Sequence, residues 1–116
     1  MKAVRMHSLG GPRQLVYEDV EMPLLGPGDA LVRVIASSIT KDELSWPPTY
    51  QTKDGQPRLP TIPGHEFAGI VDSVAADVKD VKAGDEVYGL ASFWRNGSAA
   101  EYVAVAASDI APKPRT

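Results

Sequence analysis

Short runs of alternating apolar and polar residues dominate the chain, and turn residues separate them. Such alternation is typical of strands, whose side chains point to opposite faces in turn. The pattern predicts strands over residues 2–6, 15–21, 30–37, 67–74, 86–90 and 99–105. The ten glycines and ten prolines stand mostly between these runs, where they favour turns. Many short strands and few helical periods predict a mostly β fold, a closed or partly closed barrel with short helical turns.

The segment from residue 39 to residue 64 breaks this pattern. It is rich in proline, with Pro47, Pro48, Pro57, Pro60 and, just before Gly64, Pro63. A central strand cannot lose so many N–H donors, so we expect mostly irregular structure here, and loops this long are usually functional. Thr40 and Glu43 have the spacing of a capping box, which predicts one short helical turn. The end of the chain, residues 112–116, is rich in proline and basic residues and is interpreted as a linker.

Composition narrows the class of protein. A chain of 116 residues with 43% hydrophobic and 23% charged residues is typical of one globular domain. The net charge is −3 and the basic residues are scattered, so nucleic-acid binding is not expected. The first residues lack the apolar core of a signal peptide, and no apolar stretch approaches a membrane span. A cytoplasmic protein without a membrane partner is therefore expected.

The chain contains no cysteine. Disulfides, thiol nucleophiles and thiolate metal sites are excluded in one step.

The most informative segment is Pro63-Gly64-His65-Glu66. In a regular strand His65 and Glu66 would face opposite sides, but the Pro-Gly pair can bend the chain and let both approach one pocket. Histidine changes charge near neutral pH, so His65 in a cleft is a candidate for proton transfer. The alternative is a hydrogen-bonded structural histidine beside a solvated glutamate.

Four motifs in register carry a family resemblance. They are the Gly64-His65-Glu66 run with Gly69, the segments 82–89 and 97–103, and the opening pair formed by residues 2–4 and 28–34. In this order they resemble the N-terminal half of medium-chain, zinc-type alcohol dehydrogenases and their quinone-reductase relatives. The resemblance implies a GroES-like domain over residues 1–116 and a hydride-transferring enzyme that uses NADP or NAD. The cofactor would be bound mainly by a Rossmann domain, which we expect downstream because no Gly-x-Gly-x-x-Gly unit is present here.

The same resemblance assigns roles in the loop. Thr40 falls where zinc-type members carry a cysteine ligand, and a hydroxyl replaces a thiolate poorly, so no metal site is expected. Thr40 also falls where quinone-reductase relatives carry an asparagine beside nicotinamide and substrate. Lys41 falls where several dehydrogenases place a basic residue against the cofactor pyrophosphate, a role that suits a point charge. Glu43 replaces an aspartate that supports this loop from behind.

Aromatic residues lie near the expected cleft. Trp46, Tyr50 and Phe93, with Trp94, would give flat apolar walls suited to a quinone, an enone or another conjugated carbonyl compound. The alternative is that these rings simply pack in the core.

Together these residues predict the substrate side of a zinc-independent, NAD(P)H-dependent oxidoreductase that reduces a quinone-like or conjugated carbonyl compound. Thr40, His65 and Glu66 are the candidate catalytic residues, Thr40 and Lys41 contact the cofactor, and Trp46, Tyr50 and Phe93 contact the substrate. Two alternatives stay open: a zinc-dependent alcohol dehydrogenase using His65 and Glu66, and a non-enzymatic GroES-like interaction module. This chain by itself is expected to be inactive, and an unpaired sheet edge would favour a homodimer.

Overall fold

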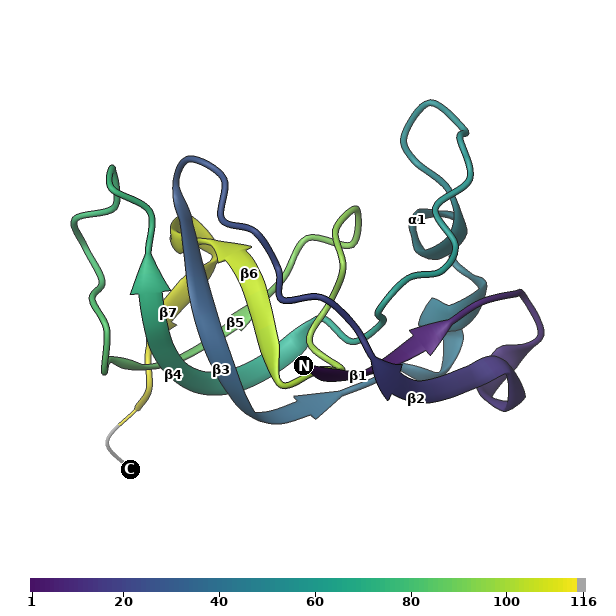
Figure 1. Cartoon of the computed structure of the whole chain (residues 1–116), viewed down its shortest axis with the longest axis horizontal. Helices are drawn as coiled ribbons and strands as arrows, with labels where there is room; N and C mark the ends of the chain where they lie inside the picture. The colour runs from purple at the N-terminus through teal and green to yellow at the C-terminus, as the bar shows by residue number, and fades with distance from the viewer. Residues whose placement is uncertain (115–116) are drawn as a thin grey trace.

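Two antiparallel sheets make up most of the regular structure in the computed structural model, which describes residues 1–114 (Figure 1). One sheet pairs β1 (Lys2–Met6) with β2 (Leu15–Asp19). The other has the order β6-β3-β4-β5-β7. Its strands are β3 (Asp29–Ser38), β4 (Glu66–Val74), β5 (Glu86–Leu90), β6 (Tyr102–Ala106) and β7 (Ile110–Pro112). The prediction of a mostly β fold is confirmed.

The five-stranded sheet has to curl, because its two edge strands follow each other in the chain. Only the 3-10 turn η3 (Ala107–Asp109) joins β6 to β7. The four Cα steps from Ala106 to Ile110 span at most about 14 Å. Four strand spacings in a flat sheet would add up to about 19 Å. Among the described strands β6 and β7 are not paired with each other, so a closed barrel is not found.

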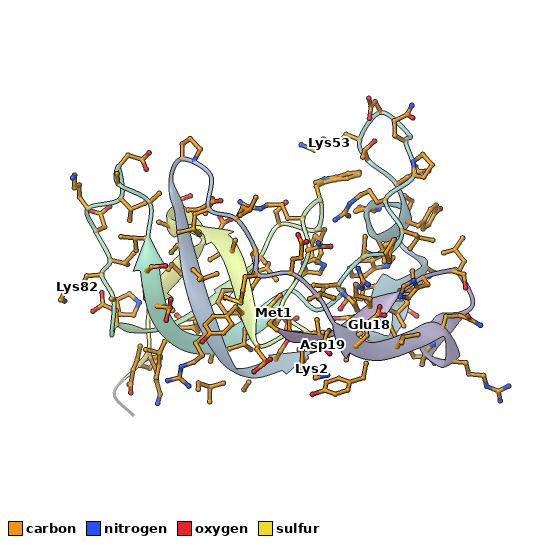
Figure 2. The ribbon with its side chains drawn as sticks, viewed as in Figure 1. Met1, Lys2, Glu18, Asp19, Lys53 and Lys82 are labelled. Carbon is orange, nitrogen blue, oxygen red and sulfur yellow. The ribbon has the colours of Figure 1, made fainter. Side chains whose placement is uncertain are left out.

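The inner face of this curled sheet forms the main core. Alternate positions of β4 and β5 point inward, as period-two patterning requires, and they meet buried residues of β3 and β6. The cluster consists of Val32, Phe67, Val71, Val87, Ala91, Val103 and Val105. The small sheet joins this body through bridges from Ala3 to Ala100 and from Met6 to Thr61. An ion pair of 2.8 Å between Lys2 Nζ and Asp19 Oδ2 links the two strands of the small sheet (Figure 2).

The proline-rich segment is irregular, as predicted, apart from two short helical turns. The first is η2 (Lys41–Ser45), a 3-10 turn that begins with the predicted capping box of Thr40 and Glu43. The second, α1 (Pro47–Tyr50), was not predicted from the sequence. Proline at a helix start loses no bond that the helix needs, which explains how this segment accommodates Pro47. A further 3-10 turn, η1 (Gly11–Gln14), connects β1 to β2.

The interpretation of residues 112–116 as a linker is wrong for its described part. Pro112 is paired with Val87 in β5, and the amide of Lys113 donates to the carbonyl of Glu86 at 2.9 Å. This docking depends on a free edge of β5, a tertiary contact that local composition does not reveal. Residues 115 and 116 lie outside the described residues. Within residues 1–114, the helices are all too short or too polar to cross a membrane.

Candidate functional site

Two glycines bring the Pro63-Gly64-His65 segment against the chain before β6. Gly64 has φ 85°, a left-handed conformation that favours glycine. Its carbonyl accepts the amide of Ser98 at 2.6 Å, and the carbonyl of Ile62 accepts the amide of Gly97 at 2.7 Å. A Cβ on Gly97 would lie 1.9 Å from the Gly64 oxygen, so only glycine permits this approach. The bend that the sequence indicated is thus real, and it orients His65.

His65 is 5% exposed and lies in a mixed polar and aromatic environment. Its Nε2 is 3.4 Å from Oε2 of Glu43, and its ring packs edge-on against Phe93 with centroids 4.8 Å apart. Its Nδ1 is buried and has no hydrogen-bond partner in the described residues. Burial lowers the pKa of His65, the Glu43 carboxylate raises it, and the charge of Arg58 lowers it again, with a net decrease. The environment of His65 therefore favours the neutral imidazole.

Glu43 links the Thr40 loop to the His65 segment. Its side chain is 2% exposed, Oε1 accepts the Thr40 amide at 2.8 Å, and Oε2 accepts the Gly64 amide at 3.1 Å. Because the Glu43 carboxylate accepts both amides, it holds the Thr40 loop and the Gly64-His65 segment close together. The expectation that Glu43 supports the loop from behind agrees with this geometry.

Two of the aromatic candidates contact each other beside His65. Trp46 and Phe93 meet edge to face with centroids 5.4 Å apart, so Phe93 lies between Trp46 and His65. Phe93 is 36% exposed and Trp46 is half-buried, which leaves part of this surface open. Tyr50, in α1, is half-buried, and its carbonyl accepts the backbone amide of Arg58 at 3.0 Å. Among the described residues its ring does not stack on Trp46, Phe93 or His65.

Glu66 and Lys41 lie apart from this group. Glu66 is exposed, and its nearest polar partner is the Ser38 hydroxyl at 3.5 Å. It lines a different hollow of about 540 Å³ over β4, β5 and β7, together with Phe67, Tyr88, Gly89, Leu90, Ser108, Asp109, Ile110 and Ala111. Lys41 is exposed at the start of η2. The structure therefore gathers Thr40, Trp46, His65 and Phe93 but does not bring Glu66 to the same place.

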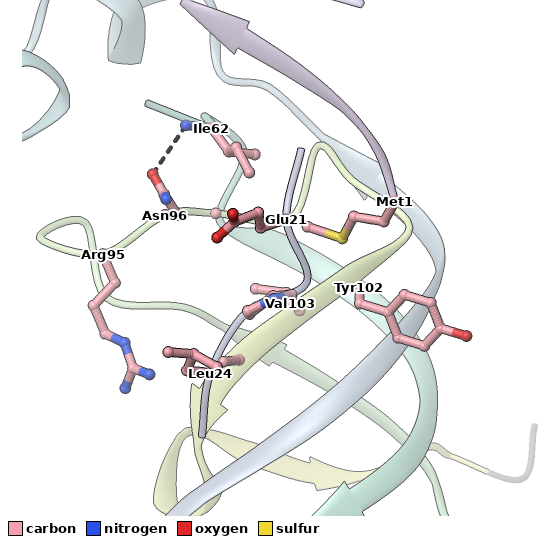
Figure 3. Close-up of a pocket in the computed structure, with 11 residues that line it drawn as sticks. Met1, Glu21, Leu24, Ile62, Arg95, Asn96, Tyr102 and Val103 are labelled. Carbon is pink, nitrogen blue, oxygen red and sulfur yellow. Dashed lines mark hydrogen bonds between the residues drawn. The ribbon is translucent and has the colours of Figure 1, made fainter. Parts of the chain in front are cut away.

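A second hollow, of about 230 Å³, lies between the segment containing Glu21 and Leu24 and the strand β6 (Figure 3). The Glu21 carboxylate and Val103 face it, and the side chain of Asn96 accepts the Ile62 amide at 3.1 Å on its far side. None of the residues predicted from the sequence to form the site lines this hollow.

The described residues around His65 do not by themselves form a catalytic zinc site. Such a site needs three protein ligands, usually including thiolate, imidazole or carboxylate. Across residues 1–114 no group of three histidine, aspartate or glutamate side chains could hold a metal ion. Glu43 is already bonded to two amides, and Thr40 offers a hydroxyl. We therefore derive no step through a metal.

Sequence reasoning missed Arg58. Its Nη1 donates to the carbonyl of Pro48 and, at 3.3 Å, to the carbonyl of Phe93. The sequence gives no signal for this role, because Arg58 stands alone in an irregular loop and its partners come from α1 and from the Phe93 loop.

Arg95 was missed for the same reason. It forms a two-point ion pair with the buried carboxylate of Asp29, at 3.1 and 2.7 Å, and thereby fixes the Phe93 loop to the start of β3. The Arg95 guanidinium holds the pKa of Asp29 below its usual range. The partners are 66 residues apart, so no local pattern could reveal them.

A curled antiparallel sheet with a long helical-turn loop over one end defines a GroES-like domain. The family model described as "Alcohol dehydrogenase GroES-like domain" matches residues 26–115. The chain belongs to this family, within the medium-chain dehydrogenase/reductase superfamily.

Known proteins agree with this assignment. A zinc-type alcohol dehydrogenase-like protein of Schizosaccharomyces pombe is 34% identical over 111 residues, covering 87% of this chain and 32% of the relative. The chloroplastic NADPH-dependent alkenal/one oxidoreductase of Arabidopsis thaliana is 34% identical over 123 residues, covering 99% and 31%. The solved quinone oxidoreductase of Coxiella burnetii superposes with a TM-score of 0.87 at 29% identity, covering 99% and 37%. The chain thus spans about a third of the length of these proteins.

Proposed function

We propose that this chain is the substrate side of a zinc-independent, NAD(P)H-dependent oxidoreductase that reduces a quinone-like or conjugated carbonyl compound. A Rossmann domain outside this sequence would supply most of the cofactor site. The names of two similar proteins, an alkenal/one oxidoreductase and a quinone oxidoreductase, support this substrate class.

One observation carries the proposal: the thiol-free arrangement in which Glu43 links Thr40 to the Gly64-His65 segment beside the Phe93 and Trp46 rings. The Thr40 loop, His65 and the perpendicular rings of Trp46 and Phe93 give a partly apolar surface that suits the conjugated part of such a substrate.

In this proposal, bound NADPH supplies hydride to the conjugated system, and one proton completes the reduction to the saturated or hydroquinone product. The chain positions the reactants and excludes water. The Thr40 hydroxyl contacts nicotinamide or substrate, Lys41 contacts the pyrophosphate, and Trp46, Tyr50 and Phe93 contact the substrate. His65 would accept a proton from water at its unpartnered Nδ1 and pass it to the substrate, which returns the imidazole to its neutral form. Glu66, the other candidate for this role, lies on the wall of the neighbouring hollow and takes no part in the proton transfer.

The test uses the full-length enzyme, NADPH and a panel of quinones and enones, with and without a chelator. We expect oxidation of NADPH that the chelator leaves unchanged. Thr40→Val should lower kcat/KM about tenfold or more through loss of a hydrogen bond at the reacting group. Absence of activity on the entire panel would contradict the substrate class.

The zinc-dependent alternative has two observations in its favour: the name of the S. pombe relative and the free Nδ1 of His65. Metal analysis of the full-length protein separates the two functions. Stoichiometric zinc that is lost together with activity in His65→Ala would establish the alternative. A non-enzymatic GroES-like interaction module would instead sediment as a discrete seven-membered ring.

A further inference from the structure

Arg58 is a half-buried cation that forms no ion pair within residues 1–114. Only its Nη1 has hydrogen-bond partners there, the carbonyls of Pro48 and Phe93. The Nε–H and the two Nη2–H donors remain available. Burial lowers the pKa of Arg58 from its ordinary value, and no acidic partner compensates for this.

The two carbonyls hold the guanidinium in one orientation. When Nη1 is fixed, the remaining donors Nε–H and Nη2–H lie side by side along one edge of the planar guanidinium. This pair matches the two oxygens of a carboxylate, which binds arginine through two parallel hydrogen bonds.

Arg58 lies beside the proposed site. The carbonyl of Phe93 accepts its hydrogen bond, and the ring of the same residue contacts both Trp46 and His65. A second cation is close to this loop, because Lys53 Nζ lies 5.7 Å from the centre of the Trp94 ring. Figure 2 shows Lys53 on the loop that projects beyond α1. Arg58 and Lys53 thus both lie beside the loop that carries Phe93 and Trp94.

We propose that Arg58 is a specificity-determining residue that binds a carboxylate of the substrate, so that the preferred substrates are conjugated carbonyl compounds that carry a carboxylate. The inference rests on the proposed function for the reaction itself. The recognition of the carboxylate rests on the geometry of Arg58 alone.

A matched pair of substrates tests it: trans-4-oxo-2-pentenoate, which is an enone with a carboxylate, and its uncharged methyl ester. With the full-length enzyme and NADPH, kcat/KM for the acid should exceed that for the ester by about tenfold or more, the value of a charge-assisted bidentate contact. Arg58→Gln should remove this preference by raising KM for the acid much more than KM for the ester, whose change reports only the loss of the two hydrogen bonds to Pro48 and Phe93. Arg58→Lys should restore it only in part, because lysine lacks the planar fork.

The control is Arg33→Gln, which removes the same charge from an exposed position on β3 and should alter neither substrate. If Arg58→Gln impairs acid and ester equally, the residue only braces the loop and the inference is wrong. If it raises KM for NADPH measured with the ester, Arg58 binds a cofactor phosphate, which also overturns the inference.

A binding measurement separates failure of this inference from failure of the proposed function. Calorimetric titration with the saturated acid 4-oxopentanoate and its methyl ester needs no turnover. Tighter binding of the acid by the wild-type protein, lost in Arg58→Gln, would support carboxylate recognition even if no enone is reduced. Equal binding of acid and ester would refute it even if enones are reduced.

Discussion

At the scale of single residues, one carboxylate organises the site. Glu43 is buried and satisfies two backbone amides that no other side chain reaches among the described residues, those of Thr40 and Gly64. Both amides belong to segments without regular pairing, so their positions depend on this side chain. The sequence showed the capping-box spacing but could not show the bond to Gly64, which crosses 21 residues.

Glu43→Gln should therefore lower the free energy of unfolding by about 1–3 kcal/mol, because the amide keeps one acceptor and turns an NH₂ group toward a buried donor. Urea denaturation measures the change. The matched control is Glu66→Gln at an exposed position, which should stay within about 0.5 kcal/mol of the wild type. Equal effects of the two substitutions would contradict a linking role for Glu43.

His65 should make stability depend on pH. Its pKa in the folded state is lower than the ordinary value of 6.5, so the unfolded state binds more protons between these two values. The stabilisation is complete above about pH 6.5 and is lost as the pH falls through the folded-state pKa. Urea midpoints between pH 7.5 and pH 5 should show this slope in the wild type. His65→Gln should flatten the slope, whereas His7→Gln, at an exposed position, should preserve it.

At the scale of elements, close backbone approach fixes where the site segment lies. Gly97 lets the chain before β6 touch the Gly64 carbonyl, and Gly69 similarly lets β4 approach Arg33 in β3. These are packing requirements between elements, and a glycine in a sequence does not reveal which neighbour it meets.

Gly97→Ala should destabilise the protein by about 3 kcal/mol or more, because a Cβ at this position overlaps backbone atoms that cannot move aside as a side chain would. Thermal unfolding followed by circular dichroism measures the effect. Gly26→Ala is the control, since its Cβ would make an ordinary contact of 3.5 Å with Asp29. A Gly97→Ala protein as stable as the control would contradict the close approach.

Period-two patterning found six strands, five of which bury residues; β2, the exception, alternates without any buried residue. It placed β3 and β4 within one residue of their observed bounds. It missed β7, whose three residues are too few for a pattern, and α1, whose two prolines imply a loop unless the helix start is recognised. For the site, the Pro-Gly-His-Glu motif, the family resemblance and the aromatic residues pointed to His65, Thr40, Trp46 and Phe93, whose roles stay predictions. Arg58 and Arg95 depend on partners that only the fold brings near.

At the scale of the whole molecule, a free edge remains on the small sheet. Among the described strands β2 pairs only with β1, and Val16 and Tyr17 on it are 42% and 70% exposed. An exposed apolar edge strand is a surface for pairing with another chain. We expect this edge to mediate the homodimer that the sequence led us to expect.

Sedimentation equilibrium over a range of concentrations should show a monomer–dimer equilibrium. Val16→Lys should shift it to monomer, since an edge lysine opposes strand pairing. The companion substitution Ile35→Lys places the same charge at an exposed position of β3 and should leave the equilibrium unchanged. A wild-type protein that stays monomeric at high concentration would rule out the dimer.

The three-residue link between β6 and β7 constrains the shape of the domain. Its length sets an upper limit on the distance between these strands and so requires a curled sheet, and its residues Ser108 and Asp109 line the hollow that Phe67 and Ile110 share. Insertion of a few glycines into this link would let β6 and β7 move apart and reduce the curvature of the sheet, and it would change no residue of any strand. A change of length in this one turn would therefore alter the curvature of the sheet, although the turn is far along the chain from the loop that contains Thr40.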